Sequence, residues 1–468
     1  MTTATPTAPT VPESPQEQLR RLCDPGSFRP LRSAVSSPRL GERAAPGDGV
    51  FSGAGEIAGR PVFCYAQDAA FLGGSLGEVH ADTIVRLMRM AGDAGAPVVG
   101  FVRSGGARLQ EGHTALAGYG RIFRASVELS RKVPQISILS GVSAGGGAYS
   151  PALTDFVVMT EEARMFLTGP QVIREAMGEE VSMEDLGGPR IHGRNGVCQL
   201  VAADTSAAIE TTRRLLGLLP QSIGSRFPAT VPVAPEGDPG DTVPASPRKV
   251  YDVRDVAAAV VDAETLLELS PRWAPNMVTA MARIDGRPVG ILANQPRSLG
   301  GVIDAAGSEK AALFVASCDR FRLPIVVLVD TPGFLPGRRQ EELGVIRHGA
   351  SLLHAFAAAT VPKLTVVLRK AFGGAAITMN SKDLGADVVF SWPKAEIGIM
   401  AARQAVGIVH RRALAEDGGP DREQLADAYA GEHLTAAAAA ASGFVDEVID
   451  PAATRDSLAW ALRSLGER

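Results

Sequence analysis

The stretch Pro97-Val98-Val99-Gly100-Phe101-Val102-Arg103-Ser104-Gly105-Gly106 has a second version at Pro324-Ile325-Val326-Val327-Leu328-Val329-Asp330-Thr331-Pro332-Gly333. Each version starts with a proline, continues through a short apolar run and ends in a loop that contains glycine. This pattern predicts a buried strand that stops at a loop. The two prolines are 324 − 97 = 227 residues apart.

Three further landmarks recur at almost the same offset. Gly73-Gly74 matches Gly300-Gly301 (301 − 74 = 227), Val133-Pro134 matches Val361-Pro362 (362 − 134 = 228), and Gly145-Gly146 matches Gly373-Gly374 (373 − 145 = 228). Solenoid repeats run to roughly 20–50 residues, so this period is that of a whole domain. The sequence therefore predicts two copies of one fold.

Strand and helix patterns alternate in both copies, which predicts an α/β fold with parallel strands and right-handed crossovers. In the first copy we expect strands at 97–102, 135–139 and 156–159, a helix at 117–131 and a glycine turn at 141–147. In the second we expect strands at 324–329, 363–368 and 388–390, helices at 346–359, 436–441 and around 458–465, and a turn at 372–374.

Composition is that of an ordinary globular protein: 468 residues, 45% hydrophobic, 21% charged and a net charge of −4. Nothing in it favours nucleic acid or an anionic membrane as a partner, and no apolar run approaches the ~20 residues of a membrane span. We expect a disordered Thr/Pro-rich tail at 1–15, a first domain at 16–220, a proline-rich linker at 221–249 and a second domain at 250–468.

The four cysteines, Cys23, Cys64, Cys198 and Cys318, are far apart in the sequence. They predict neither a disulfide framework nor a metal site, and they are typical of a reducing compartment, which we take as the cytoplasm.

The glycine pairs that follow the predicted strands are the best candidates for chemistry. A turn at a helix N-terminus presents free backbone N–H groups, and the helix dipole adds partial positive charge there. Glycine lets a thioester or urea oxygen approach without a clash with Cβ. Two such donors form an oxyanion hole, and each is worth about 3 kcal/mol of barrier. The alternative is that each pair only permits tight packing of a helix on a strand.

Other motifs have weaker support. Gly141-Val142-Ser143-Ala144-Gly145 matches the G-x-S-x-G nucleophile elbow. However, the equivalent position in the second copy, 143 + 228 = 371, is alanine. Asp330-Thr331-Pro332-Gly333 resembles a GTPase switch loop, but the chain has no P-loop. Two pairs of adjacent glutamates are best interpreted as solvent-exposed side chains: Glu161-Glu162 and Glu341-Glu342. His348 is either a ligand-positioning or a structural residue.

Several motifs resemble the carboxyltransferase (β) subunits of biotin-dependent acyl-CoA carboxylases, over about residues 24–451. They are SGGARLQEG at 104–112, YSPALTD at 149–155, ANQP at 293–296, DTPGFLPG at 330–337, IRHGA at 346–350 and ATVPKLTVVLRKAFGG at 359–374. The resemblance implies two tandem crotonase-like domains, and a hexamer whose sites lie between the first domain of one chain and the second of another.

The resemblance also implies roles for single residues. Gly145 and Gly146 match the pair that receives the thioester oxygen of acyl-CoA, and Gly374 and Ala375 match the pair that receives the ureido oxygen of biotin. Ile377 matches a position that lines the acyl pocket. The remaining residues implied in substrate binding are Ser104, Gly105, Gly106, Ala107, Ala144, Gly147 and Gly373.

Partners follow from what the sequence lacks. The chain has no Met-Lys-Met biotinylation site and no ATP-grasp loop, so biotin is expected on a biotin carboxylase/biotin carboxyl carrier (α) subunit. The resemblance implies transfer of CO₂ from carboxybiotin to the α-carbon of a short- or medium-chain acyl-CoA. A decarboxylase on the same fold and a non-catalytic subunit remain alternatives. Departures from the family pattern include Arg103 in place of an acid and Ala376 in place of an aromatic residue.

Overall fold

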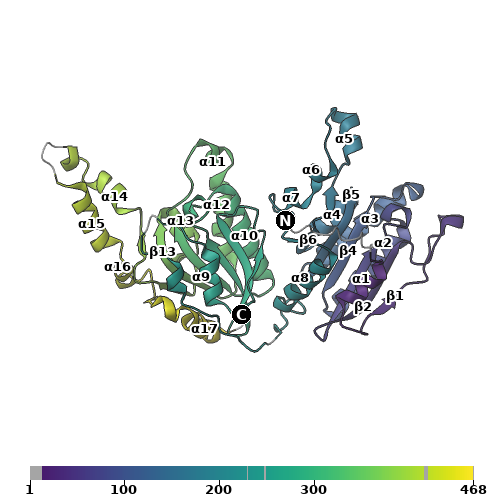
Figure 1. The fold of residues 1–468 in the computed structure, drawn as a ribbon, viewed down its shortest axis with the longest axis horizontal. Helices are drawn as coiled ribbons and strands as arrows, with labels where there is room; N and C mark the ends of the chain where they lie inside the picture. The colour runs from purple at the N-terminus through teal and green to yellow at the C-terminus, as the bar shows by residue number, and fades with distance from the viewer. Residues whose placement is uncertain (1–12, 229, 247–248, 416–419, 467–468) are drawn as a thin grey trace, which may run out of the picture. The chain divides into compact units, whose positions relative to one another are not determined.

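The computed structural model describes residues 13–228, 230–246, 249–415 and 420–466. The chain divides into two compact units, each built around its own eight-stranded sheet (Figure 1). The first unit extends to His192 and includes Val197–Gly217, and the second contains Gly193–Gly196 and the chain from Leu218 onward.

The sheet of the first unit has the strand order β1-β2-β3-β4-β5-β6-β8, with β7 beside β5. Its strands are β1 Arg29–Leu31, β2 Val50–Ile57, β3 Arg60–Gln67, β4 Val98–Ser104, β5 Gln135–Ala144, β6 Phe156–Thr160, β7 Arg164–Phe166 and β8 Leu200–Ala202. From β3 onward neighbouring strands are parallel, whereas β1, β2 and β3 pair antiparallel. The expectation of parallel strands is therefore right for the centre of the sheet and wrong at this edge.

The second sheet repeats this arrangement, with the order β16-β14-β13-β12-β11-β10-β9 and β15 beside β13. Its strands are β9 Leu267–Leu269, β10 Met277–Ile284, β11 Arg287–Asn294, β12 Ile325–Thr331, β13 Lys363–Phe372, β14 Val388–Ser391, β15 Glu396–Gly398 and β16 Glu447–Val448. The prediction of two α/β copies of one fold is confirmed.

Helices connect or flank the strands in both units. In the first half they are α1 Pro15–Leu22, α2 Glu78–Ala94, α3 His113–Leu129, α4 Gly146–Ala152, α5 Pro170–Met177, α6 Met183–Gly187, α7 Pro189–His192 and α8 Thr205–Leu218. In the second half they are α9 Val253–Val260, α10 Ala305–Arg320, α11 Arg338–Glu342, α12 Val345–Ala358, α13 Gly373–Thr378, α14 Ala402–Val409, α15 Arg422–His433, α16 Ala436–Ala441 and α17 Thr454–Leu465.

The turn expected at 141–147 is wrong in its first half. Strand β5 continues to Ala144, because β7 pairs with its last three residues, from Val142 opposite Arg164 to Ala144 opposite Phe166. In the second unit β15 extends β13 to Phe372 in the same way. The short partner strands carry no strong sequence signal, which is why both central strands were predicted too short.

Apolar packing on the sheets makes the cores. In the first unit α2 and α3 cover the sheet through Ile84, Leu87, Ile122 and Leu129. In the second unit the helices α9 and α17 bring Val256, Val260, Leu458 and Leu462 into one core cluster with the strands of the sheet.

The proline-rich segment at 221–249 is bonded to the second unit. Arg283 Nη1 donates to the carbonyl of Pro228 (3.0 Å), Ala263 N to that of Val233 (2.9 Å) and Arg369 Nη1 to that of Lys249 (2.8 Å). A segment with these anchors is part of the packing of the second unit.

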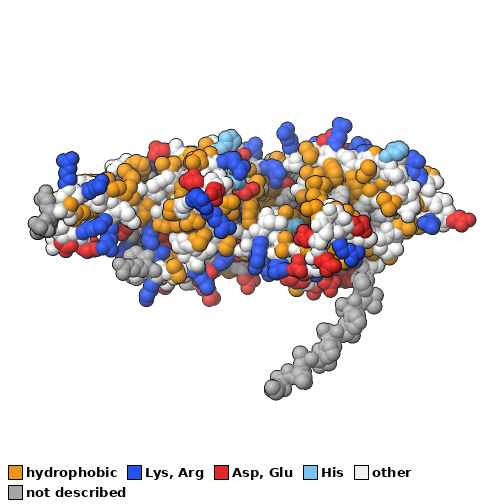
Figure 2. Space-filling model, turned by 90° about the horizontal axis from the view of Figure 1, so that it is seen from above, with side chains coloured by type: hydrophobic (Ala, Val, Ile, Leu, Met, Phe, Trp, Pro, Cys, Tyr) orange, Lys and Arg blue, Asp and Glu red, His pale blue; other side chains and the backbone are white. Residues whose placement is uncertain are grey.

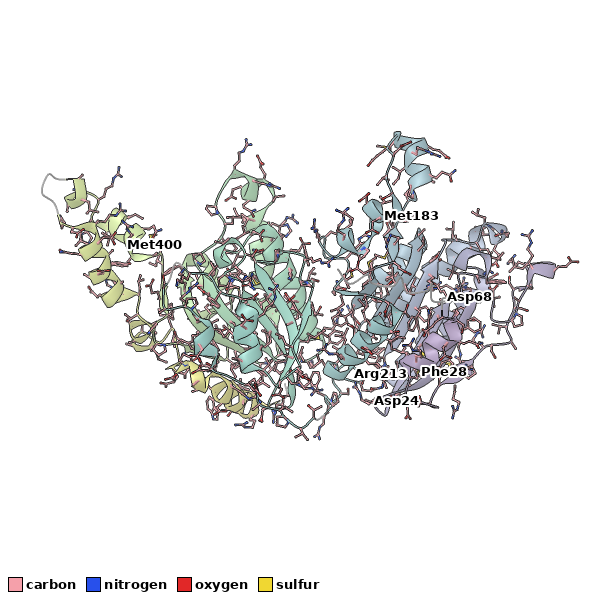
Figure 3. All side chains as sticks on the ribbon, viewed as in Figure 1. Asp24, Phe28, Asp68, Met183, Arg213 and Met400 are labelled. Atoms are coloured by element: carbon pink, nitrogen blue, oxygen red, sulfur yellow. The ribbon has the colours of Figure 1, made fainter. Side chains whose placement is uncertain are left out.

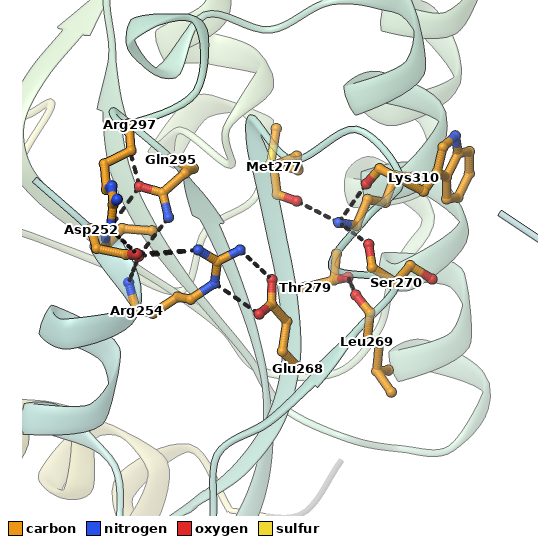
Figure 4. A network of polar contacts seen from close by, with 12 residues as sticks. Asp252, Arg254, Glu268, Leu269, Ser270, Met277, Thr279, Gln295, Arg297 and Lys310 are labelled. Atoms are coloured by element: carbon orange, nitrogen blue, oxygen red, sulfur yellow. Dashed lines mark hydrogen bonds and ion pairs between the residues drawn. The ribbon is translucent and has the colours of Figure 1, made fainter. Parts of the chain in front are cut away.

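Buried polar groups also organise the second unit (Figure 4). The ammonium group of Lys310 donates to the carbonyls of Ser270, Trp273 and Met277 at 2.7–2.9 Å. Beside it, Arg254 bridges Asp252 and Glu268. The Lys310 bonds close the loop between β9 and β10, and the Arg254 ion pairs join the start of α9 to β9.

Charge of both signs is present on the face of the molecule that Figure 2 draws. On the face drawn in Figure 2, cationic and anionic side chains are interspersed among apolar ones. Within the described residues, no helix has the length and apolar character needed to span a membrane.

Candidate active site

The first Gly-Gly doublet of each unit closes a loop against the central strand. Gly73 and Gly74 have φ of +67° and +69°, and Gly300 and Gly301 have φ of +67° and +80°. A Cβ on Gly74 would overlap the carbonyl oxygen of Arg103, and one on Gly301 would overlap that of Asp330. Arg103 and Asp330 are equivalent positions of the repeat, because 103 + 227 = 330. The same close contact between a glycine and a strand carbonyl therefore occurs in both units.

These doublets hold the loops that follow the central strands. In the first unit Leu76 N donates to Gly106 O and Arg108 N donates to Leu76 O, both at 2.9 Å. In the second, Ile303 N donates to Gly333 O (3.0 Å) and Leu335 N to Ile303 O (2.8 Å). Of the predicted substrate-binding residues, Ser104 therefore ends β4, and Gly105, Gly106 and Ala107 lie in a loop whose backbone is fixed on one side.

The charged residues of SGGARLQEG are structural. Arg108 is fully buried and pairs with Asp48 (2.6 Å) and Glu111 (2.8 Å). Burial pushes the pKa of Glu111 upward, but hydrogen bonds from the Glu78 amide, Arg108 and Ser37 outweigh it and hold that pKa below its ordinary value. This cluster fixes the end of the loop that follows β4.

We call the start of α4, residues 145–147, the first glycine end, and the start of α13, residues 373–375, the second. The first is a helix N-terminus with two free amides. Gly145 is the N-cap of α4 with φ of +58°, and its N–H donates to Phe166 O (3.1 Å). Ala148 N donates back to Gly145 O (3.0 Å). That leaves the N–H groups of Gly146 and Gly147 without an acceptor among the described residues, as expected for the first turn of a helix.

Two side chains pack directly behind these amides. A Cβ on Gly146 would lie 2.7 Å from the ring of Tyr119, and one on Gly147 would lie 2.9 Å from Cβ of Ser104. The Ser104 hydroxyl is hydrogen-bonded to the Tyr119 hydroxyl (2.9 Å). Tyr119 was not singled out from the sequence, because one tyrosine in an amphipathic helix gives no signal of its position.

The second glycine end has the same geometry. Gly373 has φ of +58°, and its Cβ position is 3.0 Å from Ile399 O; the Cβ position of Gly145 is 4.0 Å from Leu167 O. The amides of Gly374 and Ala375 have no acceptor in the described part of the chain. Gly374 is exposed, and a Cβ there would meet only the ring of Phe334, at 3.9 Å.

The free amides form equivalent pairs: 146 + 228 = 374 and 147 + 228 = 375. The sequence-based pair in the first unit, Gly145 and Gly146, is therefore displaced by one residue from the pair with free N–H groups. The cause is β7, because its pairing with β5 extends to the Gly145 amide. The pair expected in the second unit, Gly374 and Ala375, has both amides free.

The competing nucleophile Ser143 is inaccessible. Its side chain is fully buried in β5, and its hydroxyl donates to Gly147 O (2.8 Å). The hydroxyl therefore supports the α4 terminus from behind and faces no ligand.

The other candidate side chains lie away from any acid–base arrangement. The two glutamate pairs are exposed, and His348 lies 3.8 Å from Glu309. Asp330 is buried with Arg369 (3.0 Å) and Tyr251 (2.9 Å); burial raises its pKa although Arg369 opposes the shift. Ala144 ends β5, and Ile377 is 53% exposed on α13. Within the described residues no group of three acidic, histidine or cysteine side chains could hold a metal ion.

Two helix N-termini with free amide pairs, one in each copy of a duplicated α/β fold, define an enzyme class that stabilises anions with backbone donors. The chain belongs to the carboxyl transferase domain family, which matches residues 13–468. It is a carboxyltransferase with two crotonase-like units.

Particular relatives are similar over nearly the whole chain. The methylmalonyl-CoA carboxyltransferase 12S subunit of Propionibacterium freudenreichii subsp. shermanii is 46% identical, over 96% of this chain and 88% of its own length. The biotin-dependent acetyl-/propionyl-coenzyme A carboxylase beta5 subunit of Mycobacterium tuberculosis is 45% identical, over 96% of this chain and 86% of its own length. The methylmalonyl-CoA decarboxylase subunit alpha of Veillonella parvula is 43% identical, over 97% of this chain and 90% of its own length.

A solved structure agrees in fold. The transcarboxylase 12S structure, described as a hexamer with methylmalonyl-coenzyme A and methylmalonic acid bound, matches with a TM-score of 0.92 and 46% identity. The match covers 97% of this chain and 89% of that one.

Proposed function

We propose that this carboxyltransferase moves CO₂ from carboxybiotin, carried on a biotin carboxylase/carrier partner, to the α-carbon of a short- or medium-chain acyl-CoA. The supporting observation is the pair of equivalent N-termini, since the reaction develops negative charge on two oxygens. The relatives named for acetyl-/propionyl-CoA and methylmalonyl-CoA favour a small acyl group.

In the first unit, the amides of Gly146 and Gly147 would receive the thioester oxygen as it becomes an enolate oxygen. Each donor is worth about 3 kcal/mol when it is aimed at the developing charge. The buried Tyr119–Ser104 pair keeps the helix start in place, so the donors need no rearrangement during the reaction.

In the second unit, the amides of Gly374 and Ala375 suit a ureido oxygen, because they are two unpaired donors at an exposed turn. When bound, carboxybiotin would supply the carboxyl group, and the biotin anion left after release of that group would supply the base for the α-proton. The chain itself then needs to bind both partners, orient them and hold charge.

A decarboxylase is the second candidate, favoured by the similarity to a methylmalonyl-CoA decarboxylase subunit. Both reactions use the same two anion sites. They differ in whether CO₂ from a malonyl-type thioester is transferred or released.

One assay separates these functions on the purified chain. With methylmalonyl-CoA and free biotin as substrates, a carboxyltransferase forms propionyl-CoA and carboxybiotin in equal amounts. CO₂ release at the same rate without biotin would instead identify a decarboxylase. No turnover of malonyl-CoA or methylmalonyl-CoA under either condition would overturn the small acyl group that the named relatives favour.

The site itself is tested at Gly374, where the structure leaves room for a side chain. Gly374→Pro removes one N–H, and proline is tolerated in the first turn of a helix. We expect transfer to biotin to fall by about 10²–10³-fold, with acyl-CoA affinity unchanged. Gly374→Ala keeps the N–H and is the matched control, expected within a few-fold of wild type. Equal activity of the two variants would refute the donor role.

A further inference from the structure

The fold brings two of the four cysteines together, against the expectation from their spacing. The Cys23 and Cys64 sulfurs are 3.9 Å apart although 41 residues separate them in the chain. Cys23 follows helix α1, and Cys64 lies in the middle of β3. Both side chains are buried, at 3% and 0% exposed.

The neighbouring strand is shaped around this pair. A Cβ on Gly55 of β2 would lie 2.5 Å from the Cys23 sulfur. Glycine at that position therefore leaves the space that the Cys23 side chain fills on its way to Cys64.

Polar bonds hold the backbone on both sides of Cys23. Arg213 of α8 donates to Leu22 O and to Asp24 Oδ1, both at 2.6 Å, and Asp24 and Arg213 lie side by side in Figure 3. Asp24 also accepts from the amides of Ala58 (3.1 Å) and Gly59 (2.9 Å). Cys23 is thus held over the β2–β3 hairpin rather than placed there by loose packing.

The two thiols differ in acidity. The hydrogen bond with Cys64 is the largest cause that lowers the pKa of Cys23, and Arg213 adds to it. The same hydrogen bond and full burial raise the pKa of Cys64. Because the thiolate is the nucleophile in thiol oxidation, Cys23 is the sulfur expected to react first.

We propose that Cys23 and Cys64 form a reversible disulfide when the protein meets a hydroperoxide, and that this bond ties α1 to β3. The Cys23 thiolate attacks the peroxide, so an S–O bond forms, the O–O bond breaks and hydroxide leaves. The Cys64 sulfur then attacks Cys23, so the S–S bond forms and the S–O bond breaks. Two thiols are oxidised by two electrons, and hydrogen peroxide is reduced to two waters.

Geometry allows the step with a small movement. A disulfide has a sulfur–sulfur distance of about 2.05 Å, so the sulfurs must approach by about 1.9 Å. The bond would close a loop of residues 23–64 that contains β1, β2 and the first half of β3, and would constrain the unfolded state of that region. Because Cys23 is the C-cap of α1, the bond would also hold the end of this helix on β3. The oxidised form should therefore resist local unfolding of the N-terminal helix.

The other two cysteines are internal controls. Cys318 is fully buried, and burial raises its pKa. The Cys198 thiol is hydrogen-bonded to Leu200 O (3.1 Å). Neither sulfur is within hydrogen-bond distance of another cysteine in the described part of the chain.

The experiment uses the full-length protein treated with hydrogen peroxide. We expect a mass loss of about 2 Da that dithiothreitol reverses, a cross-linked peptide that joins residues 23 and 64, and a rise in Tm of about 5 °C or more. Cys23→Ser and Cys64→Ser should each abolish all three changes, whereas Cys198→Ser and Cys318→Ser should retain them.

Other results would overturn the proposal. These are an unchanged thiol count after exposure that oxidises a control thiol peptide, stable sulfinic acid at Cys23 in place of the cross-link, or a disulfide that includes Cys198 or Cys318. A serine variant that fails to fold is replaced by Cys23→Ala or Cys64→Ala, which keep a small apolar side chain.

Discussion

His80 is the buried titratable side chain that connects the first candidate site to its supporting helix. Its Nε2 lies 3.1 Å from Gln67 Nε2, and Gln67 Oε1 accepts the amide N–H of Arg103 (3.1 Å). Burial is the main cause that lowers the pKa of His80 to about 3, and the Arg108 charge lowers it further. The imidazole is therefore neutral in the folded protein at physiological pH.

This pKa predicts acid sensitivity of the first unit. An unfolded chain protonates His80 below pH 6.5, whereas the folded one resists protonation until about pH 3. The unfolded state thus binds the extra proton throughout this window, so the free energy of unfolding falls as pH falls from 6.5 towards 3. We expect a loss of about 2 kcal/mol between pH 7 and pH 5 from this residue alone.

Urea unfolding at the two pH values measures the loss. His80→Gln should unfold with a smaller difference between pH 7 and pH 5 than wild type, even if it is less stable at both. An identical difference in the two proteins would show that His80 does not carry the effect.

At the scale of elements, alanine substitutions at the two positions of a glycine doublet are expected to lower the free energy of unfolding by different amounts. Nothing lies within 4 Å of a Cβ on Gly300, whose φ is +67°, whereas a Cβ on Gly301 would overlap the carbonyl oxygen of Asp330. Gly300→Ala should therefore cost about 1–2 kcal/mol of stability, the strain of a left-handed residue. Gly301→Ala should cost more, because the loop must also move away from β12.

Guanidinium unfolding of the second unit distinguishes the two variants, and the pair Gly73→Ala and Gly74→Ala repeats the test in the first unit. We expect the same order in both units. The reverse order in either would contradict the equivalence of the two loops.

Sequence patterns identified most of the elements near the site but not their exact ends. The apolar runs after Pro97 and Pro324 predicted β4 and β12 within one or two residues, because a buried parallel strand is a continuous apolar run. The ends of β5 and β13 depend on the short strands β7 and β15, which a local pattern cannot show. The same tertiary pairing decides which amides of the first glycine end are free, so the pair with free amides lies one residue beyond the pair expected from the sequence.

Distance in sequence was also a poor guide to proximity for the cysteines. Cys23 and Cys64 meet because α1 packs on the β2–β3 hairpin, and this hairpin was not anticipated. Tyr119 meets the start of α4 for a similar reason, through packing of α3 and α4. Contacts between elements, rather than the elements themselves, were the part that the sequence patterns could not supply.

At the scale of the whole molecule, each unit presents one helix start with a pair of free amides, whereas the proposed transfer needs two such pairs around one pair of substrates. We expect a homohexamer, as the transcarboxylase 12S relative is described, with sites shared between a first unit and a second unit of different chains. Analytical ultracentrifugation should find six times the chain mass, and a monomer at micromolar concentration would contradict this assembly.

Mixing of inactive subunits tests whether sites are shared. One variant loses the donor in the second unit through Gly374→Pro. The other loses it in the first unit through Gly146→Pro, combined with Tyr119→Ala because the ring occupies the space of a Cβ at residue 146. Tyr119→Ala alone is the control for packing. If sites combine units of different chains, co-expression of the two inactive variants creates some sites with two intact ends, and transfer of CO₂ from methylmalonyl-CoA to biotin reappears. If each site lies within one chain, every site in the mixture keeps one damaged end, and activity stays at the level of the separate variants.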